Sequence, residues 1–375
     1  MLDSGVIKEF LAQEFELIGI CPAVTPAGLS KFNSWLDAGY AGEMSYLPDR
    51  RDAYAHPSSV LDNVRSIVML GSKYANQKSI THLNCDGKIA RYARSGLDYH
   101  DVIHGKLKSA KQHFESLDPK ASFRGVVDTA PLLEREFAQL AGLGWQGKNT
   151  MLISKTDGSW FFLSALLTDL ELEYDQPFEA QHCGSCTACL DACPTDAFVE
   201  PFVMNGSKCI SYFNIESQSL PSTKFRHQIG NWLFGCDVCQ EVCPWNQKST
   251  AYISEDEEQN ELTGDQTGLS IEEIHELFKL DEPTFRRRFR KTPFWGRKRR
   301  GILRIAAIVL GNQTRPDSIP ILIQGLNEQE PLIRAACVWA LGEFNGEKSR
   351  IALSNLMRTE INESVLTELN LAIRK

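Results

Sequence analysis

The sequence has 375 residues and a formal net charge of −8, with 42% apolar and 23% charged residues. This length allows two or three domains that each bury a core, and the negative charge excludes nucleic-acid binding by the whole surface while leaving room for a local basic patch. No apolar run approaches the ~18 residues of a membrane span, and the acidic start lacks the basic stretch of a secretory signal. We therefore expect a cytoplasmic protein with no membrane role.

Residues 1 to about 175 alternate helical patterns with short apolar runs. The two clearest runs begin at Ser66 and Ser159 and are bounded by glycine and polar residues. Runs of this length and composition favour buried strands. Their alternation with helices indicates an α/β or α+β domain, and we predict an N-terminal α/β domain.

A third apolar run, Gly125-Val-Val, presents Asp128 at its end and is followed by an amphipathic pattern with Pro131 near its start. Proline in this position is typical of a first helical turn. Asp128 or Thr129 is therefore either a helix N-cap or a functional group at the end of a strand. The glycine-rich segment 142–150 follows; it lacks the spacing of a phosphate-binding loop but allows the backbone to approach a large flat ligand.

Eight of the eleven cysteines lie between residues 183 and 243. The run Cys183-Gly-Ser-Cys-Thr-Ala-Cys-Leu-Asp-Ala-Cys-Pro194 has the spacing of bacterial ferredoxins, in which the fourth cysteine binds the other cluster. The run Cys236-Asp-Val-Cys-Gln-Glu-Val-Cys-Pro244 repeats the end of this motif, and Cys209 completes it. We predict a bacterial-ferredoxin-like module with two [4Fe–4S] clusters. One is held by Cys183, Cys186, Cys189 and Cys243, and the other by Cys209, Cys236, Cys239 and Cys193.

The alternative for these cysteines is a pair of structural Cys₄ zinc sites, which also use C-x₂-C pairs. Zinc does not require four cysteines in one run or Cys-Pro at both ends, so we favour iron–sulfur clusters. The remaining Cys21, Cys85 and Cys337 lack such spacing and are predicted to be buried structural thiols.

The chain beyond the cysteines begins with an acidic, polar stretch from Ser254 to Gly268, which predicts an exposed connection. From Ser270 onward the pattern is helical. Leu310-Gly311 and Leu341-Gly342 each end an alanine-rich apolar helix, which is a weak internal repeat similar to HEAT repeats. Two helix pairs are fewer than the roughly three that a solenoid needs, so we expect this region to lean on the preceding domain.

A basic segment, residues 285–300, carries nine Lys or Arg residues among aromatic residues in this otherwise acidic chain. Such a patch combines phosphate neutralisation with base stacking and indicates RNA contact. The alternative is a solvated, salt-bridged helical face. The residues predicted to contact RNA are Arg286, Arg287, Arg290, Lys291, Arg297, Lys298, Arg299 and Arg300.

Several segments together resemble the cobalamin-dependent epoxyqueuosine reductases, which complete queuosine synthesis on tRNA. The resemblance covers nearly the whole chain and is carried by the segments that begin at Arg91, Asp128, Gly144 and Arg299, together with both ferredoxin-like halves. The cluster motif by itself is shared with many redox proteins, but the combination is specific. Ile305 departs from the asparagine expected in the last segment.

The resemblance implies a base-off cobalamin next to one cluster and a tRNA that carries epoxyqueuosine in its anticodon. Asp128 matches the proton donor of the family, with a pKa that we expect to be raised by burial beside the corrin. By position, the further cofactor contacts are Tyr99, His100, Lys148 and Asn149, for which core packing or surface solvation is the alternative. The electrons come from an unidentified low-potential donor, and we expect a monomer.

Two other interpretations stay open at this point. A reductive dehalogenase-like enzyme also combines a corrin with two clusters, and a non-catalytic ferredoxin-like carrier needs only the clusters. The predicted fold is α+β in three parts. Residues 1–175 form the cobalamin- and substrate-binding domain, residues 176–250 the two-cluster module, and residues 268–375 an all-α HEAT-like domain that contacts tRNA.

Overall fold

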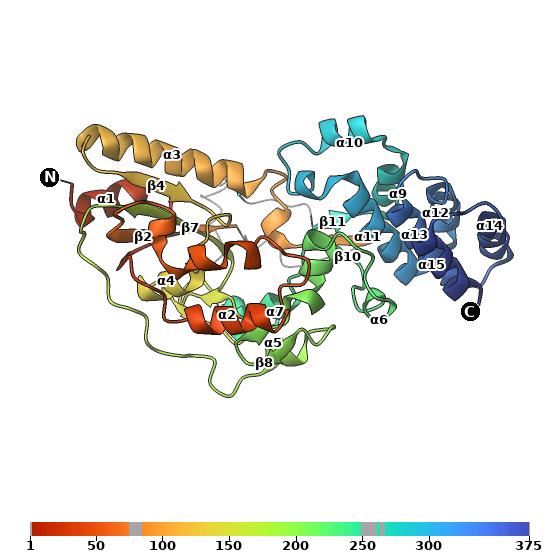
Figure 1. The fold of residues 1–375 in the computed structure, drawn as a ribbon, viewed down its shortest axis with the longest axis horizontal. Helices are drawn as coiled ribbons and strands as arrows, with labels where there is room; N and C mark the ends of the chain where they lie inside the picture. The colour runs from red at the N-terminus through yellow and green to blue at the C-terminus, as the bar shows by residue number, and fades with distance from the viewer. Residues whose placement is uncertain (1, 75–84, 249–260, 263–266, 375) are drawn as a thin grey trace. The chain divides into compact units, whose positions relative to one another are not determined.

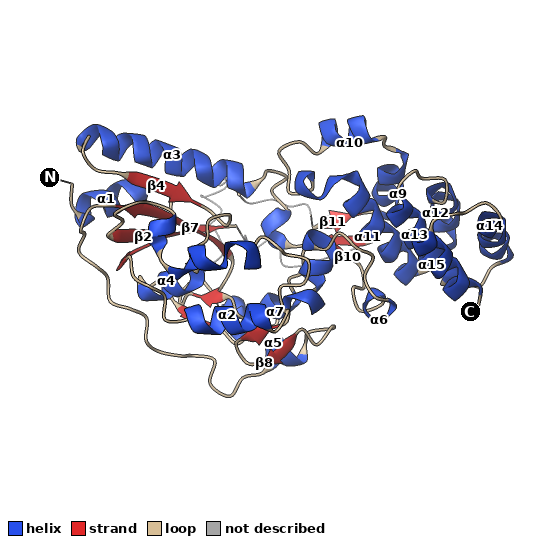
Figure 2. Cartoon of the chain, in the orientation of Figure 1, coloured by secondary structure: helices blue, strands red, loops and turns tan. Residues whose placement is uncertain are grey.

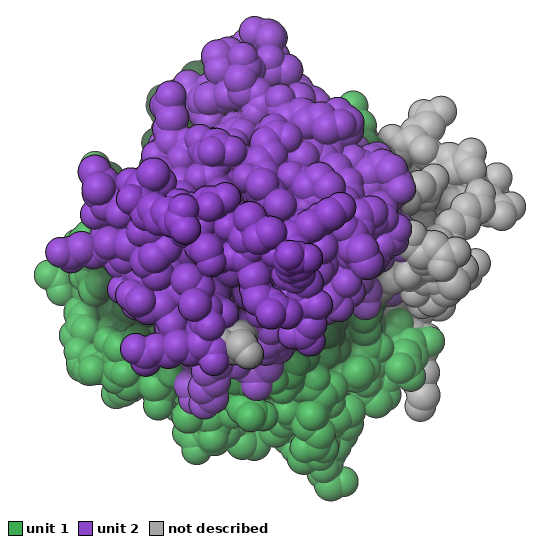
Figure 3. Space-filling model, turned by 90° about the vertical axis from the view of Figure 1, so that its right-hand side faces the viewer, with its two compact units in different colours: residues 1–80, 97–206, 237–264 green, residues 81–96, 207–236, 265–375 purple. Residues whose placement is uncertain are grey.

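The computed structural model describes residues 2–74, 85–248, 261–262 and 267–374 (Figure 1). The chain divides into two compact units (Figure 3), unit 1 with residues 1–80, 97–206 and 237–264, and unit 2 with residues 81–96, 207–236 and 265–375. The predicted cluster module, residues 176–250, contributes to both units, so the three-domain division stays a prediction. Most of the acidic stretch lies outside the described residues.

Unit 1 is built around a four-stranded sheet with the strand order β1–β2–β7–β4. The strands are β1 Leu17–Pro22, β2 Ser66–Lys73, β4 Phe123–Val126 and β7 Phe161–Thr168. Each neighbouring pair is antiparallel. The predicted α/β domain is therefore wrong, because that class requires parallel strands joined by crossover helices. The N-terminal region is α+β.

Helices cover both faces of this sheet (Figure 1). Helices α1 (Ser4–Leu11) and α3 (Tyr99–Leu117) lie on one face, and α4 (Glu134–Leu140) lies on the other. Helix α4 packs Phe137 and Ala138 into the apolar cluster beneath β2 and β7. Since both faces are covered, β2 is buried along almost its whole length, which explains its continuous rather than alternating apolar sequence.

The remaining elements of unit 1 are short. They are α2 Leu29–Asp37, the 3₁₀ helices η1 Pro48–Ala55 and η2 Pro57–Ser59, the hairpins β5 Trp145–Gln146 with β6 Leu152–Ile153 and β8 Phe198–Glu200 with β9 Val203–Met204, and the helices α5 Ala188–Asp191, α7 Val238–Glu241 and α8 Pro244–Lys248. The described cysteine-rich segment is thus rich in turns, as predicted.

Unit 2 is mainly helical (Figure 2). Its principal helices are α6 Thr223–Arg226, α9 Ile271–Lys279, α10 Glu282–Arg288, α11 Lys298–Gln313, α12 Ile319–Gly325, α13 Pro331–Gly342, α14 Glu347–Met357 and α15 Glu363–Ile373. Short turns of helix are η4 Arg91–Ala93, η6 Tyr212–Glu216, η8 Trp295–Arg297 and η9 Pro316–Ser318. A small sheet joins β10 Trp232–Phe234, β3 Gly87–Ile89 and β11 Gly268–Leu269.

The internal repeat has a structural basis in two equivalent glycines. A Cβ on Gly311 would lie 2.9 Å from the Ala340 Cα of α13, and a Cβ on Gly342 would lie 2.8 Å from the Ala372 Cβ of α15. Each glycine thus lets the next helix of the series approach closely. Helix α9 begins where the sequence predicts it, with Ser270 and Glu273 forming a capping box. Among the described residues, no helix has both the length and the apolarity to cross a bilayer.

Candidate active site and cluster sites

Asp128 lies in a loop between β4 and α4, which we call the Asp128 loop (residues 127–133). Helix α4 begins at Glu134, and its N-cap position is occupied by Leu133 without a side-chain cap. The N-cap interpretation of Asp128 and Thr129 is therefore wrong. The backbone of Asp128 is in the left-handed region, with φ of 57°, a conformation that aspartate tolerates better than most residues.

The carboxylate of Asp128 accepts hydrogen bonds from the first turn of α3. Tyr99 Oη lies 3.1 Å and His100 Nε2 lies 3.3 Å from Asp128 Oδ2. On its other side, His100 Nδ1 lies 2.7 Å from Oδ1 of Asp98, the N-cap of α3. Tyr99 stacks on Phe162 of β7 with ring centroids 4.1 Å apart. The structure thus brings together three of the predicted site residues, Tyr99, His100 and Asp128.

The ionisable groups around Asp128 differ in their protonation states. Burial by itself lowers the pKa of His100, but its hydrogen bonds to Asp128 and Asp98 outweigh burial and raise that pKa to about 9. Burial, with a contribution from the charge of Asp128, raises the pKa of Glu134 to about 8. At neutral pH, His100 is therefore a cation and Glu134 is a neutral acid.

The protein neighbours of Asp128 lower its pKa, and the rise expected beside a bound corrin stays a prediction. The hydrogen bond from His100 is the largest effect on this carboxyl group, and together with the bond from Tyr99 it lowers the pKa of Asp128 despite desolvation. The sequence predicted an apolar neighbour for Asp128 but no cationic partner. The fold supplies that partner, His100. Many protein atoms surround this carboxylate, yet its side chain is 62% exposed, so it stays accessible to a ligand.

The four cysteines predicted for the first cluster all belong to unit 1, and their thiols gather in one place. Burial raises the pKa of Cys189 to about 11, and the neighbouring thiols of Cys243, Cys183 and Cys186 add to this rise. Repulsion between neighbouring thiolates disfavours their ionisation, and a bound cationic cluster would remove that penalty. The described cysteines form no disulfides.

The segment from Gly144 to Thr150 supports the loops of these cysteines. Trp145 packs with Cys243, Cys183, Phe178 and Trp245 in an apolar cluster. Lys148 Nζ donates hydrogen bonds to the carbonyls of Gly184 at 2.7 Å and Cys186 at 2.9 Å. The buried Asn149 donates to the carbonyl of Cys239 at 3.2 Å. Lys148 and Asn149 thus fix the cysteine loops, and their contact with the cofactor stays a prediction.

Of the second predicted ligand set, Cys193 and Cys239 belong to unit 1, and Cys209 and Cys236 belong to unit 2. Cys193 Sγ accepts a hydrogen bond from the backbone N–H of Ala197 at 3.4 Å. Beyond that contact, this ligand set stays a prediction.

Two of the three other cysteines are buried, as predicted. Cys21 and Cys337 are fully buried in apolar surroundings, and burial raises the pKa of Cys21 to about 12. Cys85 is only partly buried, and its thiol faces the carbonyl of Thr267 in unit 2.

The basic segment consists of α10, η8 and the start of α11. Arg286, Arg287, Arg290, Lys291 and Lys298 are exposed, whereas Arg297 and Arg300 are partly buried. Among its aromatic residues, Phe285 and Phe294 belong to the core, and Trp295 is 40% exposed with the guanidinium of Arg286 over its ring. Trp295 can therefore stack on a base, whereas the buried Phe285 and Phe294 cannot.

Arg299 is a correction to the predicted RNA contacts. Its side chain is about nine-tenths buried and forms an ion pair with Glu328. It also donates to the backbone carbonyls of Leu280 and Phe278. A guanidinium with these partners is not available to a phosphate, so Arg299 is a structural residue.

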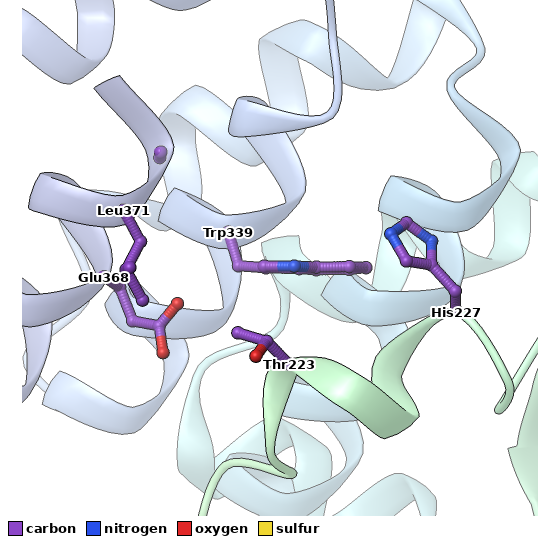
Figure 4. Close-up of a pocket in the computed structure, with 6 residues that line it drawn as sticks. Thr223, His227, Trp339, Glu368 and Leu371 are labelled. Carbon is purple, nitrogen blue, oxygen red and sulfur yellow. The ribbon is translucent and has the colours of Figure 1, made fainter. Parts of the chain in front are cut away.

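A pocket in unit 2 is lined by Thr223, His227, Trp339, Glu368, Leu371 and Ala372. In Figure 4 the Trp339 ring lies between His227 on one side and Glu368 on the other. The carboxylate of Glu368 binds both terminal nitrogens of Arg226, each at 2.7 Å. This ion pair holds α6 against α15.

Three family models match successive parts of the chain. Residues 55–129 match epoxyqueuosine reductase QueG, DUF1730; residues 182–246 match a 4Fe-4S double cluster binding domain; and residues 300–374 match HEAT repeats. The epoxyqueuosine reductase of Vibrio cholerae is 34% identical over 88% of this chain and 88% of its own length. The chain belongs to the epoxyqueuosine reductase family. The Escherichia coli K12 member is 33% identical over 88% of this chain and 86% of its own length.

Solved structures of epoxyqueuosine reductases share the fold throughout. One, in complex with an epoxyqueuosine-modified stem loop of tyrosine tRNA, is 27% identical with a TM-score of 0.88 and covers 98% of this chain and 96% of its own. Another, from Bacillus subtilis, has its catalytic aspartate loop swung out of the active site. It is 26% identical with a TM-score of 0.84 and covers 98% of this chain and 97% of its own. Family members are oxidoreductases, so the electron-carrier interpretation is set aside.

Sequence reasoning missed four residues around Asp128. Asp98 and Glu134 lie within the segments that carry the family resemblance, so their presence beside Tyr99 and Asp128 in the sequence was a usable signal. Arg50, which donates to the carbonyl of Thr129, and Tyr54, which senses the charges of Asp128 and Glu134, come from η1, far away in the sequence. No local pattern connects them with Asp128.

Proposed function

We propose that this protein reduces epoxyqueuosine to queuosine in the anticodon of tRNA, with cobalamin and two [4Fe–4S] clusters as cofactors. The observation that carries the proposal is the contact of Asp128 with Tyr99 and His100, in a member of this family, at a carboxylate that stays open to a ligand. Removal of the epoxide oxygen as water consumes two electrons and two protons. The site must therefore supply both.

The residues around Asp128 suit a corrin held without a protein ligand to the metal. Both ring nitrogens of His100 are engaged, one with Asp98 and one with Asp128, so His100 is not free to bind cobalt. The ring of Tyr99 is stacked between Phe162 and His100, which fixes its hydroxyl beside the open carboxylate of Asp128. Cobalamin in the base-off form would supply a low-potential cobalt centre for reduction of the epoxide carbon.

Asp128 donates the proton to the opening C–O bond in this proposal. Since its own pKa is lowered, it acts as a transfer group for a proton held by a neighbour. His100 is that neighbour, because its pKa is raised to about 9 and its Nε2 lies 3.3 Å from the carboxylate. Tyr99 orients the same oxygen through its hydroxyl.

The cluster bound by Cys183, Cys186, Cys189 and Cys243 would deliver electrons from an apolar environment. Trp145, Phe178 and Trp245 surround its ligands, and a desolvated environment of this kind tunes cluster potentials. The second cluster, bound by Cys193, Cys209, Cys236 and Cys239, would receive them from a low-potential donor.

The tRNA would contact the exposed basic residues of α10, η8 and α11. Arg286, Arg287, Arg290, Lys291 and Lys298 offer charge for phosphates, and Trp295 offers a ring for stacking. The modified nucleoside would leave the base stack to reach Asp128, because chemistry on a base requires its extrusion.

The first test measures cofactor content and turnover in one preparation. The protein is purified without oxygen and reconstituted with iron, sulfide and cobalamin, and we expect about eight irons and about one cobalt per chain. A tRNA stem loop carrying epoxyqueuosine is then supplied with a low-potential reductant, and the product nucleoside is analysed by mass spectrometry.

Loss of one oxygen atom from the nucleoside supports the proposal. Full iron content without bound cobalt contradicts the cobalamin part. Cobalt binding with dehalogenation of a small aryl halide, and no change in the RNA, favours the dehalogenase-like alternative.

A further inference from the structure

The backbone of the Asp128 loop is held in an unfavourable conformation. Asp128 has a φ of 57°, and the N–H of Thr129 bonds back to the carbonyl of Val127 at 2.6 Å, which closes a tight turn. A left-handed backbone is unfavourable for a residue with a side chain, and it persists only where the surroundings fix it. The contacts that fix this loop therefore also fix the direction of the Asp128 carboxylate.

Two side chains bind the loop backbone on either side of the Asp128 α-carbon. Glu134 Oε1 accepts a hydrogen bond from the backbone N–H of Asp128 at 3.0 Å. Arg50 Nη2 donates to the carbonyl of Thr129 at 2.7 Å. The first of these contacts comes from the start of α4 and the second from η1, so two separate elements clamp the turn.

Glu134 is an unusual neighbour for Asp128, because two carboxylates at close distance repel each other. Burial and the charge of Asp128 both disfavour ionisation of Glu134. The other titratable and charged groups facing it are Arg135 on its own helix, His100 on α3 and Tyr54 on η1, and Arg50 lies beside Tyr54. Of the two acids, Glu134 keeps the proton and Asp128 carries the charge.

We propose that Glu134 is a positioning residue. Its neutral side chain acts as a latch, which means that it binds the backbone of the Asp128 loop and keeps the loop closed, with the carboxylate of Asp128 directed at His100 and Tyr99. Its importance for catalysis rests on the proposed role of Asp128 as proton donor, whereas the anchoring of the loop does not. Glu134 itself makes no contact with substrate in this scheme.

A neutral latch has a specific pH dependence. Once the loop opens, Glu134 is exposed to water and its pKa returns to about 4.3. Between this value and its closed-state pKa of about 8, the closed form binds one more proton than the open form. Closure therefore weakens as pH rises, by up to about tenfold per pH unit. Between pH 5 and 6, Asp128 stays ionised and His100 protonated in both forms, so this window isolates Glu134.

The test is amide hydrogen exchange of peptides covering residues 127–133 in the full-length reconstituted protein, corrected for intrinsic exchange rates. The variants are Glu134→Ala, Glu134→Gln and the control Glu136→Ala. Glu136 lies two positions further along α4 and accepts from the backbone N–H of Gly28 through both oxygens, each at 3.0 Å. It is thus a backbone-binding carboxylate outside the loop.

We expect Glu134→Ala to raise exchange in this segment by about tenfold, the effect of losing one hydrogen bond, while Glu136→Ala leaves it unchanged. Glu134→Gln keeps the acceptor oxygen, so it should keep the protection. It should lose the fall in protection between pH 5 and 6 that the unsubstituted protein shows. Glu134→Ala should also lower kcat with little change in KM.

Equal exchange in Glu134→Ala and Glu136→Ala overturns the proposal, and so does an unchanged pH dependence in Glu134→Gln. Peptides from β7 report whether each variant is folded. If Glu134→Ala unfolds, the pH dependence of exchange in Glu134→Gln, compared with that of the unsubstituted protein, tests the proposal. An unsubstituted protein that exchanges as expected but leaves epoxyqueuosine unchanged would refute the proposed function and leave the latch intact.

Discussion

Two groups of charged side chains in this protein differ in how completely they are paired. In unit 2, the buried Arg226 meets Glu368 through two parallel bonds, and its third nitrogen donates to the carbonyl of Pro221 at 2.6 Å. In unit 1, the carboxylate of Asp128 stays largely exposed, beside a second acid and a cationic histidine. Full pairing stabilises a fold, whereas incomplete pairing leaves groups available for proton transfer.

The largest effect should come from Asp128→Asn. Asparagine tolerates the left-handed backbone but cannot donate a carboxylic proton, so we expect turnover to fall by about 10²- to 10⁴-fold. Cofactor content and the free energy of unfolding should stay close to those of the unsubstituted protein. Retention of most activity in a single-turnover assay would remove Asp128 from the proposed mechanism.

Substitutions in the Arg226–Glu368 pair should change the free energy of unfolding. Replacing Arg226 by Met leaves the carboxylate of Glu368 buried without its partner, which should lower the free energy of unfolding by about 3–5 kcal/mol. The double variant Arg226→Met, Glu368→Leu should recover most of this loss. Urea denaturation followed by tryptophan fluorescence measures both. A double variant as unstable as the single one would show that packing, rather than the ion pair, is at stake.

The pH dependence of turnover sharpens the comparison further. The pKa of His100 is raised above its ordinary value of 6.5, so its charged form contributes stability that is complete below 6.5 and lost as pH rises through about 9. The supply of protons to Asp128 should fall over the same upper limb, by about tenfold per pH unit above pH 9. His100→Gln should remove this limb from the pH–rate profile; an unchanged profile would assign the proton to another group.

The smallest effect should appear at the exposed basic residues. Arg287→Ala should weaken tRNA binding a few-fold and reduce the salt slope of binding by about 1, with less than about 0.5 kcal/mol change in stability. Arg299→Ala is the matched comparison, because Arg299 is buried and paired with Glu328. It should destabilise unit 2 and leave the salt slope unchanged. The opposite pattern would restore Arg299 as an RNA contact.

The sequence by itself determined the features that depend on local spacing. The C-x₂-C-x₂-C run placed Cys183, Cys186 and Cys189 together, because three cysteines separated by two residues each can reach one cluster whatever the rest of the fold does. The helical periodicity after Ser270 was equally local, and the structure adds a capping box at that position. The apolar run at Ser66 was correctly predicted as a buried strand for the same reason.

Only the tertiary structure decided the features that depend on which distant segments meet. The sequence could not show that the sheet is antiparallel, since strand direction depends on how the chain returns. It placed Arg299 with its basic neighbours, although the fold buries that side chain beside Glu328. It also did not show that His100 lowers the pKa of Asp128, because a pKa follows the charges within a few ångströms, and His100 reaches Asp128 from helix α3.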